Sequence, residues 1–301
     1  IRPGRCFRPV YTDRNIEEIL RCSDHITFNS VAQFERFGPM ALLRGISCGL
    51  RINPQYSPVE TDLYNPCVPG SRLGVTADLL KELPAGIDGL HFHVLCESRP
   101  HHLRLALEAV EKHFDQYLDR IKWLNMGGGH LMTHAEYDCD ELIALLREFK
   151  ARHPHLRLIL EPGSAFTWRT GYLVSTIEDL VENAGVHTAM LDVSFACHMP
   201  DCLEMPYKPA IVGAHEPAEG EKRWRMGGTS CLAGDYYGDW AFDHELKVGE
   251  RIVFEDMIHY TMVKTTMFNG VAHPAIVIAR RDGRIDVVRE FGYEDFRNRM
   301  S

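Results

Sequence analysis

Two apolar runs in the chain end in residues that could hold a charged cofactor. The first run, residues 123–126, leads into Gly127, Gly128 and Gly129, and the second, residues 158–160, leads into Glu161. Adjacent glycines can turn their backbone N–H groups toward one point, where an anion such as a phosphate fits. A carboxylate at the end of a strand is a common place for chemistry in an α/β barrel. The pair therefore suggests a phosphorylated cofactor whose ring is held by an acid.

A second candidate site is the histidine pair His91 and His93. Side chains alternate along a strand, so a strand over residues 90–95 would place both imidazoles on one face. Such a pair can ligate a metal, and Cys96 and Glu97 follow closely. Alternatively, one imidazole can lie flat on an aromatic cofactor, or the histidines can be hydrogen-bonded core residues. The residues alone leave the three interpretations open.

Glu161 has a structural and a chemical interpretation. It could be a buried, paired acid, which is the commoner fate of a glutamate at a strand end. A carboxylate beside a pyridine nitrogen favours the protonated form of that nitrogen. A protonated pyridine is an electron sink that stabilises a carbanion. The patterns GxxxxGK[ST] and GxGxxG do not occur, so the sequence carries neither the common mononucleotide-binding motif nor the common dinucleotide-binding motif.

The second half of the chain contributes Cys231 and Tyr260 as candidates. Cys231 lies in the polar, flexible segment 227–235 and could act as a proton donor or nucleophile where its thiol is exposed. The hydroxyl of Tyr260 could bind a phosphate. A cysteine that fills space and a tyrosine of the core are the alternatives.

The elements that must position these residues alternate between strand and helix in the first half. This alternation predicts a parallel sheet with crossover connections, and about six units can be counted where a closed β/α barrel has eight. Asp13 and Asp138 have the residue type and position of helix N-caps. The expected strands cover 6–11, 25–28, 46–52, 90–95, 121–126 and 156–160, and the expected helices cover 15–21, 31–37, 77–83, 103–118 and 139–152.

After about Thr170 the pattern changes to short strands separated by turns. We predict a β/α barrel domain over residues 1–168 and a mostly β domain over 169–301. The polar segment 215–222 is expected to be a loop. The expected strands of the second domain cover 172–177, 188–192, 251–254, 275–278 and 285–288.

Composition narrows the class of protein. The chain has 301 residues, 45% of them hydrophobic, and a net charge of -9, which argues against a nucleic acid partner. No apolar run approaches the roughly 18 residues of a membrane span. The nine cysteines are an odd number without CxxC pairs, which predicts reduced thiols and a cytoplasmic protein.

Taken in order, these segments resemble the fold type III decarboxylases that use pyridoxal 5'-phosphate (PLP), such as the ornithine and diaminopimelate decarboxylases. Each segment is weak alone, but the combination spans essentially the whole chain: Phe92-His93-Val94, Met126 with the three glycines, Glu161-Pro162-Gly163, Ser230-Cys231, Tyr260 and Phe268-Asn269-Gly270. Within the group the chain is most similar to the carboxynorspermidine (equally carboxyspermidine) decarboxylases, through segments 25–30, 33–37, 50–54, 71–74, 96–97, 198–201 and 230–235.

The resemblance implies a (β/α)8 barrel followed by a β domain, no metal, and a role for each candidate residue. His93 would stack on the pyridine ring of PLP, and Glu161 would pair with its nitrogen. Cys231 would reach into the partner subunit's site in a homodimer and return the proton after carbon dioxide leaves. Further roles are implied for phosphate binding by Gly127, Gly128, Gly129, Gly163 and Tyr260, for Arg72 near the cofactor, and for Asp201, Glu204 and Asp235 as contacts of the substrate's distant amines.

One departure from the family concerns the lysine to which it joins PLP, at the end of the first barrel strand. None of the eight lysines of this chain ends an N-terminal strand. The resemblance places Ile1 near the start of the third barrel strand, in agreement with the separate count of six units. We therefore expect the barrel to lack its first two strands here, with the lysine upstream.

A second departure is Leu232, because ornithine decarboxylases carry aspartate directly after this cysteine. Leucine there argues against ornithine and for a longer substrate. The sequence thus predicts PLP-dependent decarboxylation of carboxynorspermidine or carboxyspermidine to norspermidine or spermidine in polyamine biosynthesis. The alternatives are a non-catalytic PLP-binding regulator of the same fold, a barrel metal hydrolase that uses His91 and His93, and a diaminopimelate-type decarboxylase.

Overall fold

The computed structural model describes residues 4–301, and contacts between residues divide the chain into two compact units, Ile1–Phe166 and Thr167–Ser301. Each unit has a hydrophobic core of its own. Within residues 4–301 no helix has both the length and the apolar character needed to cross a bilayer. All nine cysteines carry free thiols.

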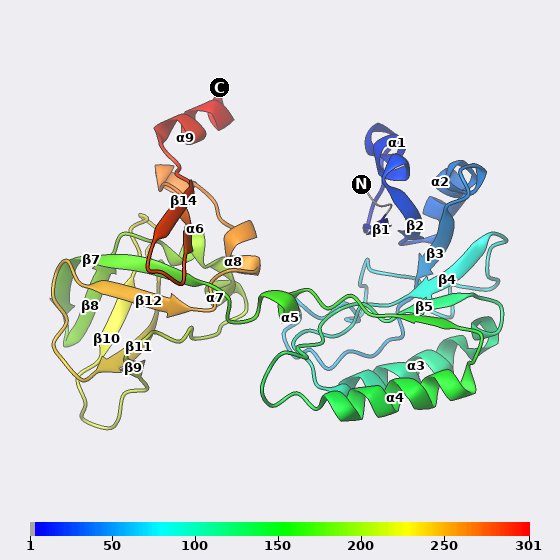
Figure 1. The fold of residues 1–301 in the computed structure, drawn as a ribbon, viewed down its shortest axis with the longest axis horizontal. Helices are drawn as coiled ribbons and strands as arrows, with labels where there is room; N and C mark the ends of the chain where they lie inside the picture. The colour runs from blue at the N-terminus through cyan, green and yellow to red at the C-terminus, as the bar shows by residue number, and fades with distance from the viewer. Residues whose placement is uncertain (1–3) are drawn as a thin grey trace. The chain divides into compact units, whose positions relative to one another are not determined.

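The first unit is built on a parallel sheet of six strands, each hydrogen-bonded to its neighbour in the sequence (Figure 1). Sequential parallel strands with intervening helices are the arrangement of a β/α barrel. The elements are β1 (Gly4–Phe7), α1 (Asp13–Arg21), β2 (Ser23–Phe28), α2 (Val31–Leu43), β3 (Ser47–Arg51), β4 (Ile87–His91), α3 (Pro100–Leu118), β5 (Trp123–Asn125), α4 (Cys139–Arg152), β6 (Arg157–Ile159) and α5 (Ser164–Thr167).

Two helix predictions need correction. The N-cap of α1 is Thr12, not Asp13, whereas Asp138 caps α4 as expected and accepts a 2.8 Å hydrogen bond from the N–H of Glu141. The helix expected over 77–83 does not form, although Leu80 and Leu83 are buried there. Pro84 follows the segment directly and disfavours a helical conformation in the residue before it. A helix this short also gains too few hydrogen bonds to offset the unfavourable free energy of forming its first turn.

The register of the sheet aligns Arg51, His91 and Asn125, which end β3, β4 and β5. Neighbouring residues of one row point to the same face of a parallel sheet, so their three polar side chains share a face. One residue earlier, Leu50, Leu90 and Leu124 are fully buried on the opposite face. The strand ends therefore carry a polar row on one side and an apolar core on the other.

Trp123 fills the space beneath this polar row. Gly49 and Gly89 are its neighbours in register, and a Cβ atom on either would meet the indole at 2.2 or 2.0 Å. The indole N–H donates a 3.0 Å hydrogen bond to the hydroxyl of Ser47. The two glycines are thus required by the large ring, and the ring supports the polar row from below.

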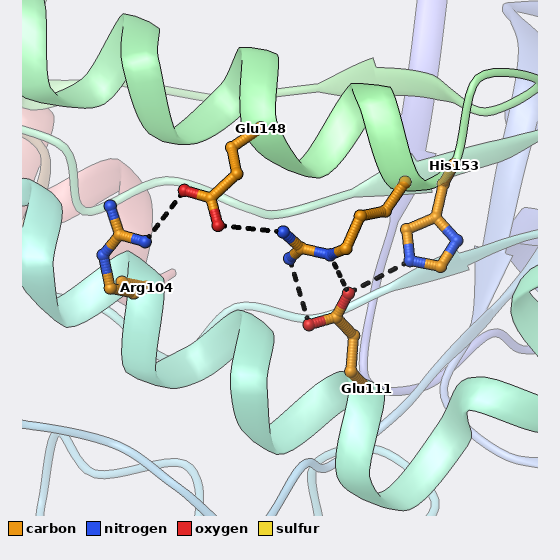
Figure 2. A network of polar contacts seen from close by, with 5 residues as sticks. Arg104, Glu111, Glu148 and His153 are labelled. Atoms are coloured by element: carbon orange, nitrogen blue, oxygen red, sulfur yellow. Dashed lines mark hydrogen bonds and ion pairs between the residues drawn. The ribbon is translucent and has the colours of Figure 1, made fainter.

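Helices α3 and α4 lie side by side and are joined by a chain of ion pairs (Figures 1 and 2). Glu111 of α3 accepts hydrogen bonds from Arg152 at 2.9 and 3.1 Å, and it contacts His153 at 3.1 Å. Glu148 of α4 contacts Arg152 at 3.0 Å and Arg104 of α3 at 3.1 Å. The network fixes the two helices against each other, away from the strand ends.

The second unit contains a six-stranded sheet in the order β12-β7-β8-β10-β11-β9, in which β8 and β10 are parallel and the other pairs are antiparallel. Strands β13 and β14 form a separate hairpin. The elements are β7 (Tyr172–Asn183), β8 (Val186–Leu191), α6 (Phe195–His198), α7 (Pro200–Glu204), β9 (Ala214–His215), β10 (Trp224–Gly227), β11 (Tyr236–Phe242), β12 (Arg251–Glu255), α8 (Tyr260–Val263), the 3-10 turn η1 (Phe268–Gly270), β13 (Ile276–Ala279), β14 (Ile285–Arg289) and α9 (Tyr293–Met300).

Candidate active site

Asn125 connects the glycine turn to Glu161. Its Nδ2 atom donates a 2.8 Å hydrogen bond to Oε1 of Glu161, and its Oδ1 atom accepts one of 2.9 Å from the N–H of Gly127. The backbone N–H of Glu161 in turn donates to the carbonyl of Gly127 at 2.8 Å. The ends of β5 and β6 are therefore held together, and one oxygen of the Glu161 carboxylate is held by Asn125.

The imidazole of His93 is also oriented by the glycine turn. Its Nδ1 atom accepts a 2.9 Å hydrogen bond from the N–H of Gly128. Burial, and then the positive charge of Arg51, lowers the pKa of His93 to about 4. The ring is therefore neutral near pH 7, as an acceptor of this hydrogen bond must be.

The three glycines are needed for close approach of neighbouring backbone. A Cβ on Gly127 would lie 2.6 Å from the carbonyl oxygen of Phe92, and one on Gly129 would lie 2.2 Å from that of Leu95. Both residues have positive φ, 69° and 88°, a conformation that favours glycine. A Cβ on Gly128 would lie 2.5 Å from the carbonyl oxygen of Glu161.

The expectation that all three glycine N–H groups converge on one anion needs correction. The N–H groups of Gly127 and Gly128 already donate to Asn125 and His93. Among residues 4–301, only the N–H of Gly129 is left without a partner in this trio. The turn therefore offers one free amide, and its other two amides orient the side chains around it.

Sequence reasoning missed the part played by Arg51 and left His91 as a metal ligand, a ring stacked on a cofactor or a core histidine. Arg51 is 5% exposed, donates to the carbonyl of His93 at 3.4 Å, and has its pKa lowered to about 10 by burial. The Nε2 atom of His91 lies 3.8 Å from Oε2 of Glu161. No group of three or more His, Cys, Asp or Glu side chains within residues 4–301 is arranged to hold a metal ion. The sequence signal that could have identified Arg51 and His91 is that each is the polar residue that ends an apolar strand.

Gly163 and Arg72 complete the candidates of the first unit. A Cβ on Gly163 would meet no heavy atom within 4 Å, so the space beside this glycine is open. Arg72 is exposed, and its carbonyl accepts a 2.8 Å hydrogen bond from the side chain of Asn29. The structure thus groups His93, the glycine turn and Glu161, with Arg72 at the surface.

In the second unit, Asp235 holds the segment that carries Cys231. The carboxylate of Asp235 accepts 2.9 Å hydrogen bonds from the N–H groups of Ala196 and Ser230, and the residue is only 4% exposed. Cys231 itself is exposed, and Nδ2 of Asn269 donates to its sulfur at 2.6 Å. This geometry supports a positioning role for Asp235, which the sequence had assigned to the substrate.

The other two proposed substrate contacts, Asp201 and Glu204, both form ion pairs with Lys264. The Lys264 ammonium lies 3.3 Å from Oε2 of Glu204 and donates to Oδ1 of Asp201 as well. Tyr260, at the start of α8, is 56% exposed. The second unit therefore presents two separate groups, Cys231 with Asn269 and the acidic pair with Lys264.

The family model of the pyridoxal-dependent decarboxylases, for the part described as the C-terminal sheet domain, matches residues 10–258. The chain belongs to this family. The predicted fold class and the resemblance to the decarboxylase group are thereby confirmed. A metal hydrolase on a barrel is not supported by this membership.

Two relatives are named as decarboxylases of carboxylated amines. The chain is 57% identical over 295 residues to the carboxyaminopropylagmatine decarboxylase of Synechocystis, covering 98% of this chain and 76% of the relative. It is 39% identical over 302 residues to a carboxynorspermidine/carboxyspermidine decarboxylase of Campylobacter jejuni, covering 96% and 78% of the two chains.

Solved structures agree with this assignment. The carboxynorspermidine decarboxylase of C. jejuni, crystallised with norspermidine, matches with a TM-score of 0.87 and 37% identity over 98% of this chain and 80% of that chain. The diaminopimelate decarboxylase of Helicobacter pylori, complexed with L-lysine, matches with a TM-score of 0.80 at 18% identity, over 98% of this chain and 78% of that chain, and shows the shared fold.

Proposed function

We propose that the protein is a PLP-dependent decarboxylase of a carboxylated polyamine, with carboxynorspermidine and carboxyspermidine as the expected substrates. The observation that carries the proposal is the Glu161 carboxylate, which Asn125 holds where β5 and β6 end, next to the glycine turn that also orients the His93 ring. Three relatives with 36% identity or more are decarboxylases named for carboxyaminopropylagmatine or for carboxynorspermidine and carboxyspermidine, which supports the proposal.

The residues of the first unit fit the coenzyme. The glycine turn brings backbone so close to His93 and Glu161 that no Cβ could be accommodated, and the space beside Gly163 is open. A neutral ring, an acid and a free amide would suit a protonated pyridine with a phosphate tail: the acid can accept from the nitrogen, and the amide can donate to the phosphate. When bound, PLP supplies the ring that accepts the electron pair left by departing carbon dioxide.

Each residue then has a defined task. Glu161 holds a proton on the pyridine nitrogen because a carboxylate favours the charged form of its neighbour. His93 would lie against the ring and exclude water from it. Gly129, Gly163 and Tyr260 would hold the phosphate, Gly127 and Gly128 would set the turn, and Arg72 would lie near the cofactor.

Cys231 is the proposed proton donor to the carbon that loses carbon dioxide. Its thiol is exposed, and the amide of Asn269 holds the sulfur in place. Serine at this position keeps the size but lowers the acidity of the donor group. A Cys231→Ser variant with unchanged turnover and unchanged product would remove Cys231 from the reaction.

A second substrate, carboxyaminopropylagmatine, is favoured by the 57% identity to the Synechocystis enzyme. Agmatine ends in a guanidinium group, and a planar guanidinium pairs well with carboxylates such as Asp201 and Glu204. Protein from the complete reading frame should be assayed with all three carboxylated substrates, and carbon dioxide and amine products quantified. Absence of coenzyme absorbance together with absence of turnover on all three would refute the proposal.

The same assay, extended to diaminopimelate as a fourth substrate, separates the remaining alternatives. A regulator would bind PLP and release no carbon dioxide from any of these substrates. A diaminopimelate-type enzyme would release it from diaminopimelate and not from the polyamines. A cytoplasmic location, expected from the cysteine content, stays a prediction.

We also propose a homodimer in which Cys231 of one subunit completes the site of the other. The test mixes a Cys231→Ser variant with a Glu161→Gln variant under conditions that exchange subunits. Random exchange should restore one intact site in half of the dimers, or about a quarter of wild-type activity. No recovery in mixed dimers of verified composition would place both residues in one subunit's site.

A further inference from the structure

The buried imidazole of His91 has no part in the function proposed above. The side chain is fully buried, and neither ring nitrogen has a hydrogen-bond partner among residues 4–301. Burying an N–H group without an acceptor is unfavourable. An acceptor close to the His91 ring is therefore expected.

The nearest acceptor is Glu161. Nε2 of His91 lies 3.8 Å from Oε2 of Glu161, while the other carboxylate oxygen, Oε1, accepts from Asn125 at 2.8 Å. His91 and Asn125 are partners in the register of β4 and β5, so they approach the carboxylate from adjacent strands. The ring of Phe7 covers His91, with 4.8 Å between ring centroids. A small rotation of the carboxylate closes the gap to a hydrogen bond.

The charge of His91 matters as much as its position. Burial, followed by the positive charge of Arg51 and then the electrostatic interaction with the neighbouring His93, holds the pKa of His91 well below its ordinary value. The ring is therefore neutral at physiological pH, with one nitrogen as a donor. A neutral donor can orient a carboxylate and leave its negative charge intact, whereas a lysine or arginine at this place would cancel that charge.

We propose that His91 is a positioning residue for Glu161. Its imidazole donates the Nε2 hydrogen to Oε2, and Asn125 donates to Oε1, so that the carboxylate faces the pyridine nitrogen of the coenzyme as a full anion. This inference rests on the proposed function, because it assigns the pyridine nitrogen as the partner of Glu161.

The test reads the protonation of the coenzyme directly. Protein from the complete reading frame is loaded with PLP labelled with ¹⁵N in the ring, and the ¹⁵N chemical shift of the bound coenzyme is followed against pH. His91→Phe keeps an aromatic ring beside Phe7 but removes the donor, whereas His91→Gln restores an N–H near the same place. His130→Phe is the matched control, since His130 is likewise buried, at 2% exposure, without a hydrogen-bond partner among residues 4–301.

In the wild type, in His91→Gln and in His130→Phe, we expect the ring nitrogen to stay protonated over the same pH range. In His91→Phe it should lose its proton at a pH lower by at least about one unit, a tenfold change in the proton equilibrium. A His91→Phe nitrogen signal equal to that of the wild type at every pH overturns the inference. Failure of the wild type to bind PLP at all would instead refute the proposed function.

A second measurement does not depend on His91→Phe and uses only the conservative variant His91→Gln for assignment. Wild-type protein labelled with ¹⁵N-histidine is titrated with unlabelled PLP, and the His91 signal is assigned by its loss in His91→Gln. We expect the Nε2 signal to move to the shift of a hydrogen-bonded neutral donor. A His91 signal that indicates a charged ring, or a bare Nε2 without a proton, overturns the inference.

Discussion

Asn125 and Glu161 lie 36 residues apart in the sequence, and their side chains form a 2.8 Å hydrogen bond. The bond follows from the parallel pairing of β5 and β6, in which Asn125 is opposite Ile159, so Glu161 emerges at the same edge two residues later. The register of the two strands thus sets the direction of the Glu161 carboxylate.

Substitution of Asn125 by alanine should weaken PLP binding. A hydrogen bond to a charged group contributes about 1.5–3 kcal/mol, so the dissociation constant should rise roughly 10- to 100-fold. The measurement is a titration of coenzyme-free protein followed by absorbance. Asn53→Ala is the matched control, since Asn53 is equally buried, at 5% exposure, and bonds to the backbone of Gln55 and Pro66. Equal losses in both variants would contradict the role of Asn125.

The glycine turn can be tested by Gly129→Ala against Gly45→Ala. Both glycines have positive φ, 88° and 68°, but a Cβ at Gly129 would meet Leu95 at 2.2 Å, whereas one at Gly45 would meet nothing within 4 Å. Backbone strain alone costs about 1 kcal/mol. We expect Gly45→Ala to lose about that much stability and keep PLP binding, and Gly129→Ala to lose more stability and bind PLP poorly. Chemical denaturation and the absorbance titration measure the two effects.

The sequence predicted the parallel sheet well because its apolar runs are bounded by clear changes of composition. Expected strands 25–28 and 46–52 coincide closely with β2 and β3, and α4 has the predicted bounds. The strand expected over 90–95 ends early, at His91, because the chain turns there to place His93 beside Gly128. Such a turn is fixed by contacts with β5, which local sequence does not encode.

The site was predictable in its residues and less so in its hydrogen bonds. Single residues such as Glu161 and His93 stand out by type, but the roles of Asn125 and His91 depend on register between strands. In the second unit, β10 and β11 were missed, because alternation there is broken by residues such as Arg225 and Gly238. The ion pairs of Lys264 join residues 60 or more positions apart, so no local pattern indicates them.

Stability should fall when the pH drops from about 6.5 toward 4. Burial, followed by the charge of His93, lowers the pKa of His130 from 6.5 to about 4. The unfolded chain therefore takes up a proton near pH 6.5 and the folded protein only near pH 4. The neutral, buried His130 therefore makes its full contribution to the free energy of unfolding above pH 6.5. This contribution is lost as the pH falls below 6.5, and the loss is about 2 kcal/mol at pH 5 for one such histidine.

Urea denaturation at pH 7 and pH 5 measures this effect. His130→Phe should bind roughly one proton fewer on unfolding near pH 5, so its stability should depend less steeply on pH. Tyr137→Phe serves as the control, because burial raises the pKa of Tyr137 to about 12 and the residue does not titrate in this range. The same pH slope in all three proteins would show that His130 is charged or exposed in solution.

Replacement of Asp235 by alanine should loosen the segment that carries Cys231. The change leaves the N–H groups of Ala196 and Ser230, which are partly buried, without their acceptor, and the loss should cost about 2–4 kcal/mol in total. Asp235→Asn should lose less, and Asp239→Asn, which breaks a partly exposed pair with Arg225, about 1 kcal/mol or less. Thermal unfolding and the rate at which a thiol reagent modifies Cys231 report the two effects. If Asp235 contacts substrate instead, its variants would keep wild-type stability and raise KM.

Lys264 offers a test of the acidic pair as the binding place for a substrate amine. Its ammonium pairs with both Asp201 and Glu204, so an incoming cation must share or displace it. Lys264→Met removes this competitor and leaves both negative charges to the substrate. We expect KM for the polyamine to fall roughly two- to fivefold, the range for a partly exposed ion pair, with kcat little changed. The fall in KM should shrink as salt is added, because salt screens exposed charges.

The control is Lys208→Met, which breaks the pair with Glu216 in the same unit and should leave KM unchanged. An unchanged or higher KM for Lys264→Met, with the control behaving as expected, would mean that the acidic pair serves Lys264 alone and that the substrate's amines bind elsewhere.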